Sequence, residues 1–265
     1  MAFKRLDDIV VHYDAPEAGE LPTLVFANSL GTDLRVWDAL LPHLGRRFRA
    51  IRYDKRGHGL TDATAAPYTM AQLGTDLARL LDFLGVRAAI VCGLSIGGLV
   101  AQQLAATRPE LVRGLILMDT AHKVGTAELW QQRIDAVEGG GIDGIAAAIL
   151  ERWFTPAFRR ERPEELAGWR NMLTRTLVAG YAGCCAAIRD ADLTATTARL
   201  AVPTLCLVGD QDGATPPPLV RELAGLVPGA RFHEIAEAGH LPGVEQPAAV
   251  ARVLLDFLEE TGLAG

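Results

Sequence analysis

Short apolar runs alternate along the chain with longer segments in which apolar residues recur every three or four positions. The short runs are typical of buried strands, and the longer segments are typical of amphipathic helices. Strands are expected at residues 23–27, 48–53, 88–92, 115–118, 204–209 and 231–235, after a short N-terminal segment at 9–13. Helices are expected at residues 34–44, 70–84, 99–106, 219–226 and 248–258. This alternation predicts an α/β fold with a mostly parallel sheet that helices cover on both faces.

The alternation is interrupted between about residues 121 and 199, where no run has a convincing strand pattern. Four stretches in this segment have helical spacing, at residues 128–137, 142–153, 164–178 and 182–190. Three glycines at 139–141 and the prolines Pro156 and Pro163 separate them. A helical block inserted into an α/β alternation predicts a cap over the catalytic edge of the sheet. We therefore expect a core formed by residues 1–120 and 200–265 and a helical cap formed by residues 121–199.

Composition narrows the classes of function. The chain has 265 residues, of which 49% are hydrophobic, so it can bury a substantial core. Its net charge of -6 is spread along the chain, and in the absence of a basic stripe we expect no nucleic-acid partner. The N-terminus lacks the apolar region of a signal peptide, and no apolar run has membrane-spanning length, so we expect a cytoplasmic protein with no membrane partner. The sequence leaves open whether the protein forms a homo-oligomer.

The four cysteines show no metal-ligand spacing. Cys92 and Cys206 lie in apolar strand-like runs, while Cys184 and Cys185 are adjacent. We expect buried free thiols, with a redox or metal role as the alternative, and we expect neither a bound metal nor a cofactor.

Candidate chemistry begins where the apolar run 88–92 ends. Gly93-Leu94-Ser95-Ile96-Gly97 is a Gly-x-Ser-x-Gly motif with a strand before it and a helix after it. In this context the serine occupies a tight turn that exposes its hydroxyl above the sheet, and only glycine fits at the flanking positions. Ser95 is therefore the candidate nucleophile. A turn built of small residues without any chemistry is the alternative.

A serine nucleophile needs a base, and His240 is the candidate. In this type of fold the base follows the nucleophile and the acid in chain order, which leaves only His233 and His240. His233 lies within an expected strand that fixes its direction. His240 lies in a loop beyond the last expected strand, from which an imidazole can reach the serine.

The acid that orients the base is expected in the loop after residues 204–209. Asp212 lies far enough into this loop to reach the histidine, whereas Asp210 is closer to the strand end and is typical of a turn residue. Asp119, at the end of another expected strand, is a third candidate. The acid holds the imidazole in the tautomer that accepts the serine proton.

Two backbone N–H groups are candidates for an oxyanion hole. The N–H of Ile96 lies at the positive end of the helix that follows Ser95. The loop 28–33 follows a strand at the same edge of the sheet, and the N–H of Leu30 is the second candidate. Another glycine-bearing loop, at residues 54–61, is too polar to be expected in a core.

Taken together, these stretches resemble the alpha/beta-hydrolase fold over nearly the whole chain, and most closely the 3-oxoadipate enol-lactonases. The resemblance rests on the loop Asn28-Ser29-Leu30-Gly31-Thr32-Asp33 with Trp37 downstream, on residues 53–59 and 93–98, and on the loops 209–216 and 238–240. Trp153-Phe154-Thr155 in the expected cap also matches. The resemblance implies an eight-stranded, mostly parallel sheet with helices on both faces and an inserted helical cap.

The resemblance also implies hydrolysis of an enol-lactone to 3-oxoadipate during aromatic-compound breakdown. The small-molecule substrate carries a free carboxylate, which needs a cation. Arg133 and Trp130 lie three apart on one expected cap helix, and Trp153 ends the next. An arginine suits a carboxylate and a tryptophan supplies an apolar wall, so these three are the expected substrate-binding residues; surface charge and packing are the alternative.

Other functions use the same scaffold. A general carboxylesterase, a C–C hydrolase or a cofactor-free perhydrolase would have the same three catalytic residues under a different cap. A haloalkane dehalogenase is disfavoured because the nucleophile position holds Ser95 instead of a carboxylate. A ligand-binding protein without catalysis is the remaining alternative, since a fold does not determine a function.

Overall fold

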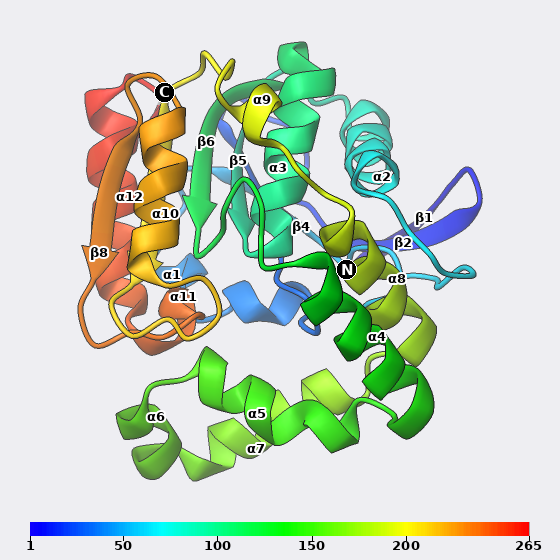
Figure 1. Cartoon of the computed structure of the whole chain (residues 1–265). Coiled ribbons are helices and arrows are strands. Elements are labelled where there is room, and N and C mark those ends of the chain that lie inside the picture. The colour runs from blue at the N-terminus through cyan, green and yellow to red at the C-terminus, as the bar shows by residue number, and fades with distance from the viewer. Residues whose placement is uncertain (265) are drawn as a thin grey trace.

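The computed structural model describes residues 1–264, which form a single eight-stranded sheet (Figure 1). The order across the sheet is β1-β2-β4-β3-β5-β6-β7-β8, and every pair is parallel except β1–β2 and β2–β4. This arrangement confirms the predicted α/β-hydrolase sheet. Its strands are β1 (Ala2–Leu6), β2 (Ile9–Asp14), β3 (Thr23–Ala27), β4 (Arg49–Tyr53), β5 (Ala89–Leu94), β6 (Val112–Met118), β7 (Thr204–Gly209) and β8 (Arg231–Ile235). The edge strand β1 was not expected from the sequence.

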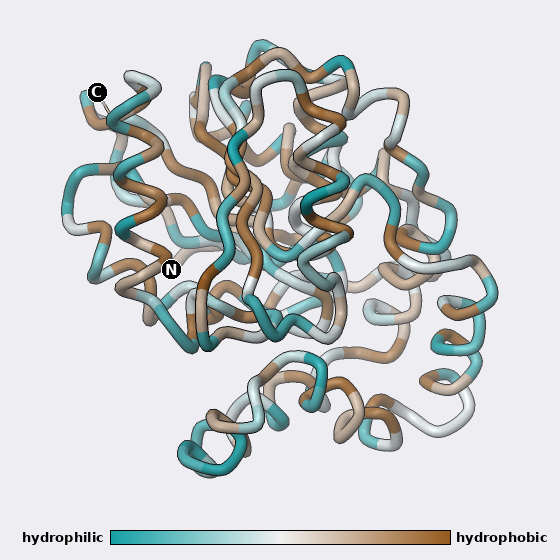
Figure 2. The backbone as a smooth tube through the Cα atoms, turned by 60° about the vertical axis from the view of Figure 1, so that its left-hand side comes forward, coloured by the Kyte–Doolittle hydropathy of each residue, from teal (hydrophilic) through white to brown (hydrophobic). Residues whose placement is uncertain are grey.

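Helices cover both faces of the sheet, as predicted. The helices α2 (Met70–Phe83), α3 (Ile96–Thr107) and α10 (Pro217–Leu226) lie on one face, and α1 (Leu41–Leu44) and α12 (Pro247–Glu260) lie on the other (Figure 1). All residues of β5 and β7 are buried between these layers. The central strands accordingly contain long hydrophobic stretches in Figure 2, because a parallel strand covered on both sides needs apolar residues on both faces.

The prediction of a single helix at residues 34–44 is wrong. The chain forms a short 3₁₀ helix, η1 (Leu34–Trp37), and then α1, which begins at Leu41. Pro42 explains the break, because proline has no N–H to donate to the carbonyl of Asp38 one turn earlier. The side chain of Asp33 caps η1 by accepting the N–H of Arg35.

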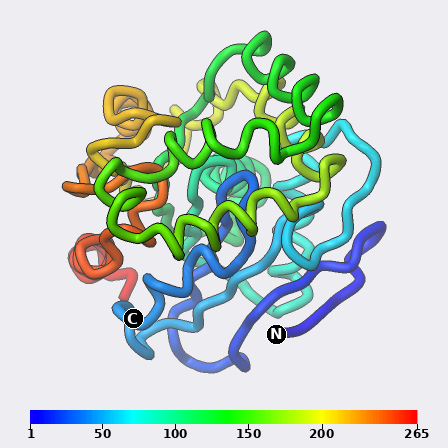
Figure 3. The backbone as a smooth tube through the Cα atoms, turned by 90° about the horizontal axis from the view of Figure 1, so that it is seen from below, coloured from blue at the N-terminus to red at the C-terminus, as the bar shows by residue number. Residues whose placement is uncertain are grey.

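The segment 121–199 contains helices and no strand, and α4 to α8 lie across the carboxyl ends of the strands (Figures 1 and 3). Its helices are α4 (Ala127–Gly140), α5 (Asp143–Trp153), α6 (Pro156–Glu161), α7 (Pro163–Thr174), α8 (Val178–Arg189) and α9 (Thr194–Thr197). Pro156 and Pro163, which we interpreted as separators, are instead the first residues of α6 and α7. Proline is favourable there because the first N–H of a helix has no partner within the helix.

Two boundaries in this segment differ from the expected ones. The helix expected at 164–178 ends at Thr174, and the next begins at Val178 instead of residue 182. The earlier start places Gly180 in α8, where its Cα packs directly against Gly57 of the loop after β4. The last helix, α9, packs against α3 of the sheet layer. The division into a core of 1–120 and 200–265 and a cap of 121–199 therefore stays a prediction.

The remaining short helices are η2 (Pro109–Leu111), which follows α3, and α11 (Pro242–Glu245), which follows the loop bearing His240. Among the described residues, the helices are too short or too polar to cross a bilayer.

Candidate active site

Ser95 occupies a strained turn between β5 and α3. Its backbone has φ 58° and ψ -120°, in the region that residues with a side chain rarely adopt. A Cβ at Gly93 would collide with the carbonyl of Gly97, and one at Gly97 would collide with the carbonyl of Ala27, so the turn requires glycine at both positions. Two hydrogen bonds fix it: the Ser95 N–H donates to Met118 O at 2.9 Å, and Thr120 Oγ1 donates to Ser95 O at 2.7 Å.

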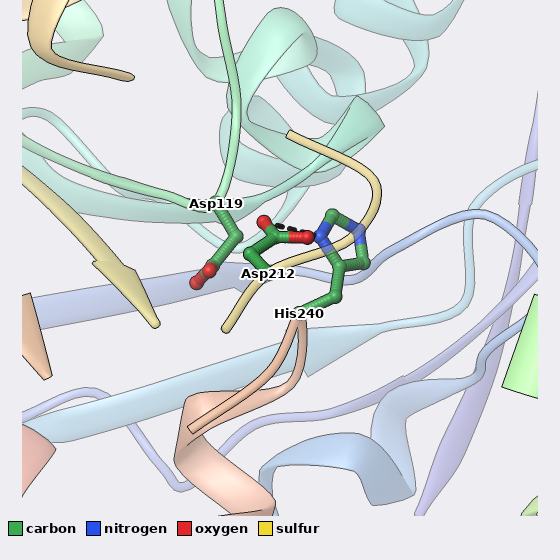
Figure 4. Close-up of side chains that lie close together, drawn as sticks. All are labelled: Asp119, Asp212 and His240. Atoms are coloured by element: carbon green, nitrogen blue, oxygen red, sulfur yellow. Dashed lines mark hydrogen bonds and ion pairs between the residues drawn. The ribbon is translucent and has the colours of Figure 1, made fainter. Parts of the chain in front are cut away.

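His240 and Asp212 form a buried pair beside this turn. His240 Nδ1 lies 2.9 Å from Asp212 Oδ2, and the two side chains are 2% and 0% exposed (Figure 4). A carboxylate can only accept, so Nδ1 carries the proton and Nε2 is left as a base. Thr215 Oγ1 also donates to Asp212 Oδ2, at 2.7 Å. This pairing is the one the sequence predicted.

Asp212 keeps its charge despite its burial. Burial works to raise its pKa, but the charge and hydrogen bond of His240, together with the hydroxyl of Thr215 and the N–H of Ala214, outweigh burial and leave the pKa below its ordinary value. The N–H groups of Ala214 and Thr215 donate to Asp212 Oδ1 at 2.7 and 3.1 Å. An ionised Asp212 is what holds the His240 imidazole in the orientation that a base requires.

Asp119 lies on the other side of Asp212 from the imidazole (Figure 4). It is fully buried, its Oδ1 accepts the N–H of Gly209 at 2.9 Å, and its Oδ2 has no hydrogen-bond partner. Burial and then the charge of Asp212 raise the pKa of Asp119 well above its ordinary value. The surroundings of the two neighbouring carboxyl groups therefore act in opposite directions: those of Asp119 favour the neutral acid and those of Asp212 favour the carboxylate.

Three side chains lie close enough together to bind a metal ion: Asp119, Asp212 and His240. Each offers one nitrogen or oxygen atom, and these atoms lie within 4.8 Å of one another. Hydrogen bonds already occupy His240 Nδ1 and Asp212 Oδ2, and burial favours the neutral form of Asp119. The hydrogen bonds thus describe an acid–base pair with a second carboxyl group behind it.

The two competing candidates take structural roles. Asp210 Oδ1 accepts the N–H of Ala238 at 3.1 Å, which ties the loop after β7 to the loop that carries the histidine. His233 is an exposed residue of β8.

The loop after β3 places the backbone N–H of Leu30 in the cavity that Ser95 also lines. The N–H of Leu30 donates to no acceptor among residues 1–264. The N–H of Ile96 belongs to the first residue of α3 and has no partner within that helix. Leu30 and Ile96 line the same cavity as Ser95. The structure thus brings together the two donors predicted for the oxyanion hole.

Buried polar side chains hold this loop, which corrects the expectation for residues 54–61. His58 Nε2 accepts the N–H of Gly31 at 2.9 Å, and Lys55 Nζ donates to Ser29 O at 2.5 Å. Burial and the charge of Lys55 lower the pKa of His58 well below its ordinary value, so it is neutral; burial lowers the pKa of Lys55 to about 8. These residues are in the interior because each polar group is paired.

A cavity with an empty volume of about 610 Å³, part of it open to solvent, joins these groups. One side, which we call the strand-end wall, consists of Ser29, Leu30, Ser95, Ile96, Thr215 and His240. The opposite side, which we call the helix wall, includes Trp130, Arg133, Ile149, Arg152, Trp153 and Tyr181. No aspartate or glutamate of the described residues lines this cavity.

The three predicted substrate-binding residues all lie on the helix wall. The Arg133 guanidinium lies 4.9 Å from the centre of the Trp130 ring, and Trp130 Nε1 donates to Val124 O at 2.6 Å. Trp153 is buried, 5% exposed. Arg133 forms no ion pair with an acidic residue of the described chain.

Sequence reasoning missed the residues that join α5 to the catalytic loops. Trp153 O accepts the N–H of His240 at 2.8 Å, and Arg152 O accepts the N–H of Gly213 at 3.3 Å. Glu245 accepts the N–H and hydroxyl of Thr155, at 3.0 and 2.8 Å, and the N–H of Gly239 at 2.5 Å. These bonds fix the end of α5 relative to the acid and the base. No local pattern could have revealed the bonds made by the end of α5, since their partners lie 60 or more residues away in the chain.

Comparison with known proteins gives consistent results. Residues 22–247 match the alpha/beta hydrolase fold family. The chain is 37% identical over 242 residues to 3-oxoadipate enol-lactonase 2 of Acinetobacter baylyi, covering 91% of this chain and 90% of that protein. The crystal structure of the enol-lactonase from Burkholderia xenovorans superposes with a TM-score of 0.94 at 36% identity, covering 97% of this chain and 100% of that one. A hydrolase from Pseudomonas aeruginosa superposes with a TM-score of 0.93 at 40% identity, covering 97% of each chain.

Proposed function

The chain belongs to the alpha/beta hydrolase fold family, and on that premise we propose that it is a serine hydrolase of small enol-lactones that bear a free carboxylate. The proposed reaction converts 3-oxoadipate enol-lactone to 3-oxoadipate in aromatic-compound degradation. The observation that carries the proposal is one acid-free cavity lined by Ser95, His240 and Arg133. Relatives that are named as enol-lactonases, at 36–37% identity, support the choice of substrate.

In this proposal Ser95 Oγ attacks the lactone carbonyl and His240 Nε2 takes its proton. Asp212 holds the imidazole by its Nδ1–H and stabilises the imidazolium that forms. The acyl C–O bond of the ring breaks, and the proton on His240 passes to the enolate or to solvent. His240 then deprotonates a water molecule, which releases the acid as the proton returns to Ser95 Oγ. The leaving group is an enolate, which departs more easily than an alkoxide, so proton donation by His240 contributes less than in the cleavage of an ordinary ester.

The oxyanion of each tetrahedral intermediate would bind to the N–H groups of Leu30 and Ile96. Backbone donors suit this task because they are fixed before the reaction and need no reorganisation as charge develops. Each such donor typically lowers the barrier by about 3 kcal/mol. The strained turn at Ser95 and the bond from Gly31 to His58 hold these two groups in place.

Arg133 supports the choice of an acidic substrate. Its guanidinium lines a cavity that contains no carboxylate of the described chain, so a ligand carboxylate is the natural partner. Trp130 and Trp153 supply apolar surface for the ring on the same wall. A substrate that binds its carboxylate on the helix wall would direct its reacting carbonyl toward Ser95 on the strand-end wall.

The test compares the enol-lactone with its own methyl ester, which removes only the charge. Arg133→Ala should lower kcat/KM for the free lactone by about 10- to 100-fold, the value of one or two hydrogen bonds to a charged group, and should change kcat/KM for the methyl ester by less than about threefold. Ser95→Ala should abolish turnover of both.

Arg160→Ala is the matched control, since Arg160 is exposed on α6, pairs with Glu161 and lines no part of the cavity. Equal kcat/KM values for lactone and methyl ester in the unmodified enzyme would refute the acidic-substrate assignment. They would leave a general esterase as the better description.

A further inference from the structure

A second hollow, an outer groove between α4 and α5, lies next to the cavity and shares part of its lining. The groove has an empty volume of about 870 Å³, including space open to solvent, and residues of these two helices form its lining. Four side chains, Trp130, Arg133, Ile149 and Arg152, line both the groove and the inner cavity. These four residues therefore lie between the groove and the cavity.

Two of the four residues are arginines on different helices. Neither Arg133 nor Arg152 forms an ion pair within residues 1–264, and neither space has an aspartate or glutamate in its lining. The cavity and its mouth thus carry two positive charges without a countercharge from the chain. One carboxylate of a substrate accounts for Arg133 and leaves Arg152 unexplained.

The position of Arg152 relative to the catalytic loops is fixed by backbone hydrogen bonds. Its own carbonyl accepts the N–H of Gly213, next to the acid Asp212, and the carbonyl of the following residue accepts the N–H of His240. Arg133 lies on α4, in contact with Trp130. A ligand with a negative group at each end could therefore contact one arginine near the catalytic loops and the other on α4.

We propose that Arg152 is a second carboxylate-binding residue, so that the cavity binds dicarboxylates across Arg133 and Arg152. This inference rests on the proposed function, because the product of that reaction is a dicarboxylate.

When the lactone opens, the acyl C–O bond breaks and water supplies an oxygen of the new carboxylate. The ring oxygen becomes the enol oxygen, which converts to a ketone, and one proton goes to solvent. The ligand charge thus changes from one negative unit to two. The new carboxylate forms at Ser95, and Arg152 would bind it once the product has moved away from the strand-end wall.

The experiment measures equilibrium binding by calorimetry in protein that carries Ser95→Ala, with adipate as the dicarboxylate and hexanoate as the monocarboxylate of equal length. We expect adipate to bind more tightly than hexanoate. Adding Arg152→Gln should weaken adipate binding by about tenfold and hexanoate binding by less than about twofold, since only one charged contact is lost. Adding Arg133→Gln should weaken binding of both ligands.

Arg160→Gln serves as the control and should change neither affinity, because Arg160 lines neither space. The proposal is overturned if adipate binds no more tightly than hexanoate, or if Arg152→Gln leaves adipate binding unchanged or weakens both ligands equally. The assay needs no turnover, so its outcome is separate from that of the proposed function. Adipate binding that depends on Arg152 in a protein that does not open the lactone would refute only the reaction.

Discussion

The two walls of the cavity are built in different ways. On the strand-end wall, every reacting group is fixed by backbone geometry or by a buried hydrogen bond: Ser95 by its turn, Leu30 by the loop that Gly31 anchors to His58, and His240 by Asp212. On the helix wall, the charged groups Arg133 and Arg152 extend from α4 and α5 without an acidic partner in the described chain.

This difference separates the reaction from the choice of substrate. Fixed groups can stabilise a transition state without reorganisation, which is what catalysis requires. A side chain that extends from a helix of the helix wall can be replaced without disturbing the sheet. We therefore expect substitutions on the strand-end wall to affect all substrates alike, and substitutions on the helix wall to affect substrates according to their charge.

The strongest test of the strand-end wall compares its two neighbouring acids. Asp212→Asn should lower kcat by about 10⁴-fold for every substrate, because an amide would favour the wrong tautomer of His240. Asp119→Asn should lower kcat by less than about threefold, since an amide is neutral like the protonated acid that it replaces. Steady-state kinetics on the free lactone and its methyl ester would measure both.

These two variants form a matched pair, because both acids are buried and lie side by side (Figure 4). A large loss of kcat in Asp119→Asn would mean that Asp119 is ionised and takes part in orienting the base. That result would contradict the assignment of Asp212 as the sole charged acid.

A smaller effect is expected at the oxyanion loop, where the N–H of Leu30 itself cannot be mutated. Gly31 has φ 75°, and a Cβ there would meet Leu173, Tyr181 and Trp153. Gly31→Ala should therefore shift the loop and lower kcat by about 10²-fold on acidic and neutral substrates alike. Gly144→Ala in α5 is the control, since nothing lies within 4 Å of its Cβ.

Thermal unfolding of both glycine variants would show that the protein remains folded at the assay temperature. A folded Gly31→Ala enzyme with unchanged kcat would remove this loop from the oxyanion hole. A loss for the acidic lactone alone would assign the loop to substrate selection instead.

Much of the fold could be predicted because hydrophobic periodicity reports burial directly. The strands at 23–27, 204–209 and 231–235 were predicted with the bounds that the structure shows. The predicted helix bounds were wrong where a single proline overrides the helical spacing of the apolar residues. Pro42 divides an otherwise regular helical pattern, and Pro156 begins a helix that we had interpreted as a gap.

The catalytic residues of the candidate site could be predicted because they lie in segments that follow strands. Ser95, Asp212 and His240 each lie in a segment that follows a strand, and the structure brings these segments together. The supporting residues could not be predicted in the same way. Glu245 and His58 act through hydrogen bonds to Thr155 and Gly31, which are distant in the chain, and the burial of His58 contradicts the polarity of its own segment. Their roles depend on tertiary contacts that no local pattern contains.

The most direct test of the central claim is mass spectrometry after treatment with a serine-directed fluorophosphonate. The account predicts a single covalent adduct on the peptide that contains Ser95, and labelling slowed by orders of magnitude in His240→Ala, because the base activates the nucleophile. No adduct at Ser95 in folded protein, or equally rapid labelling without His240, would contradict it.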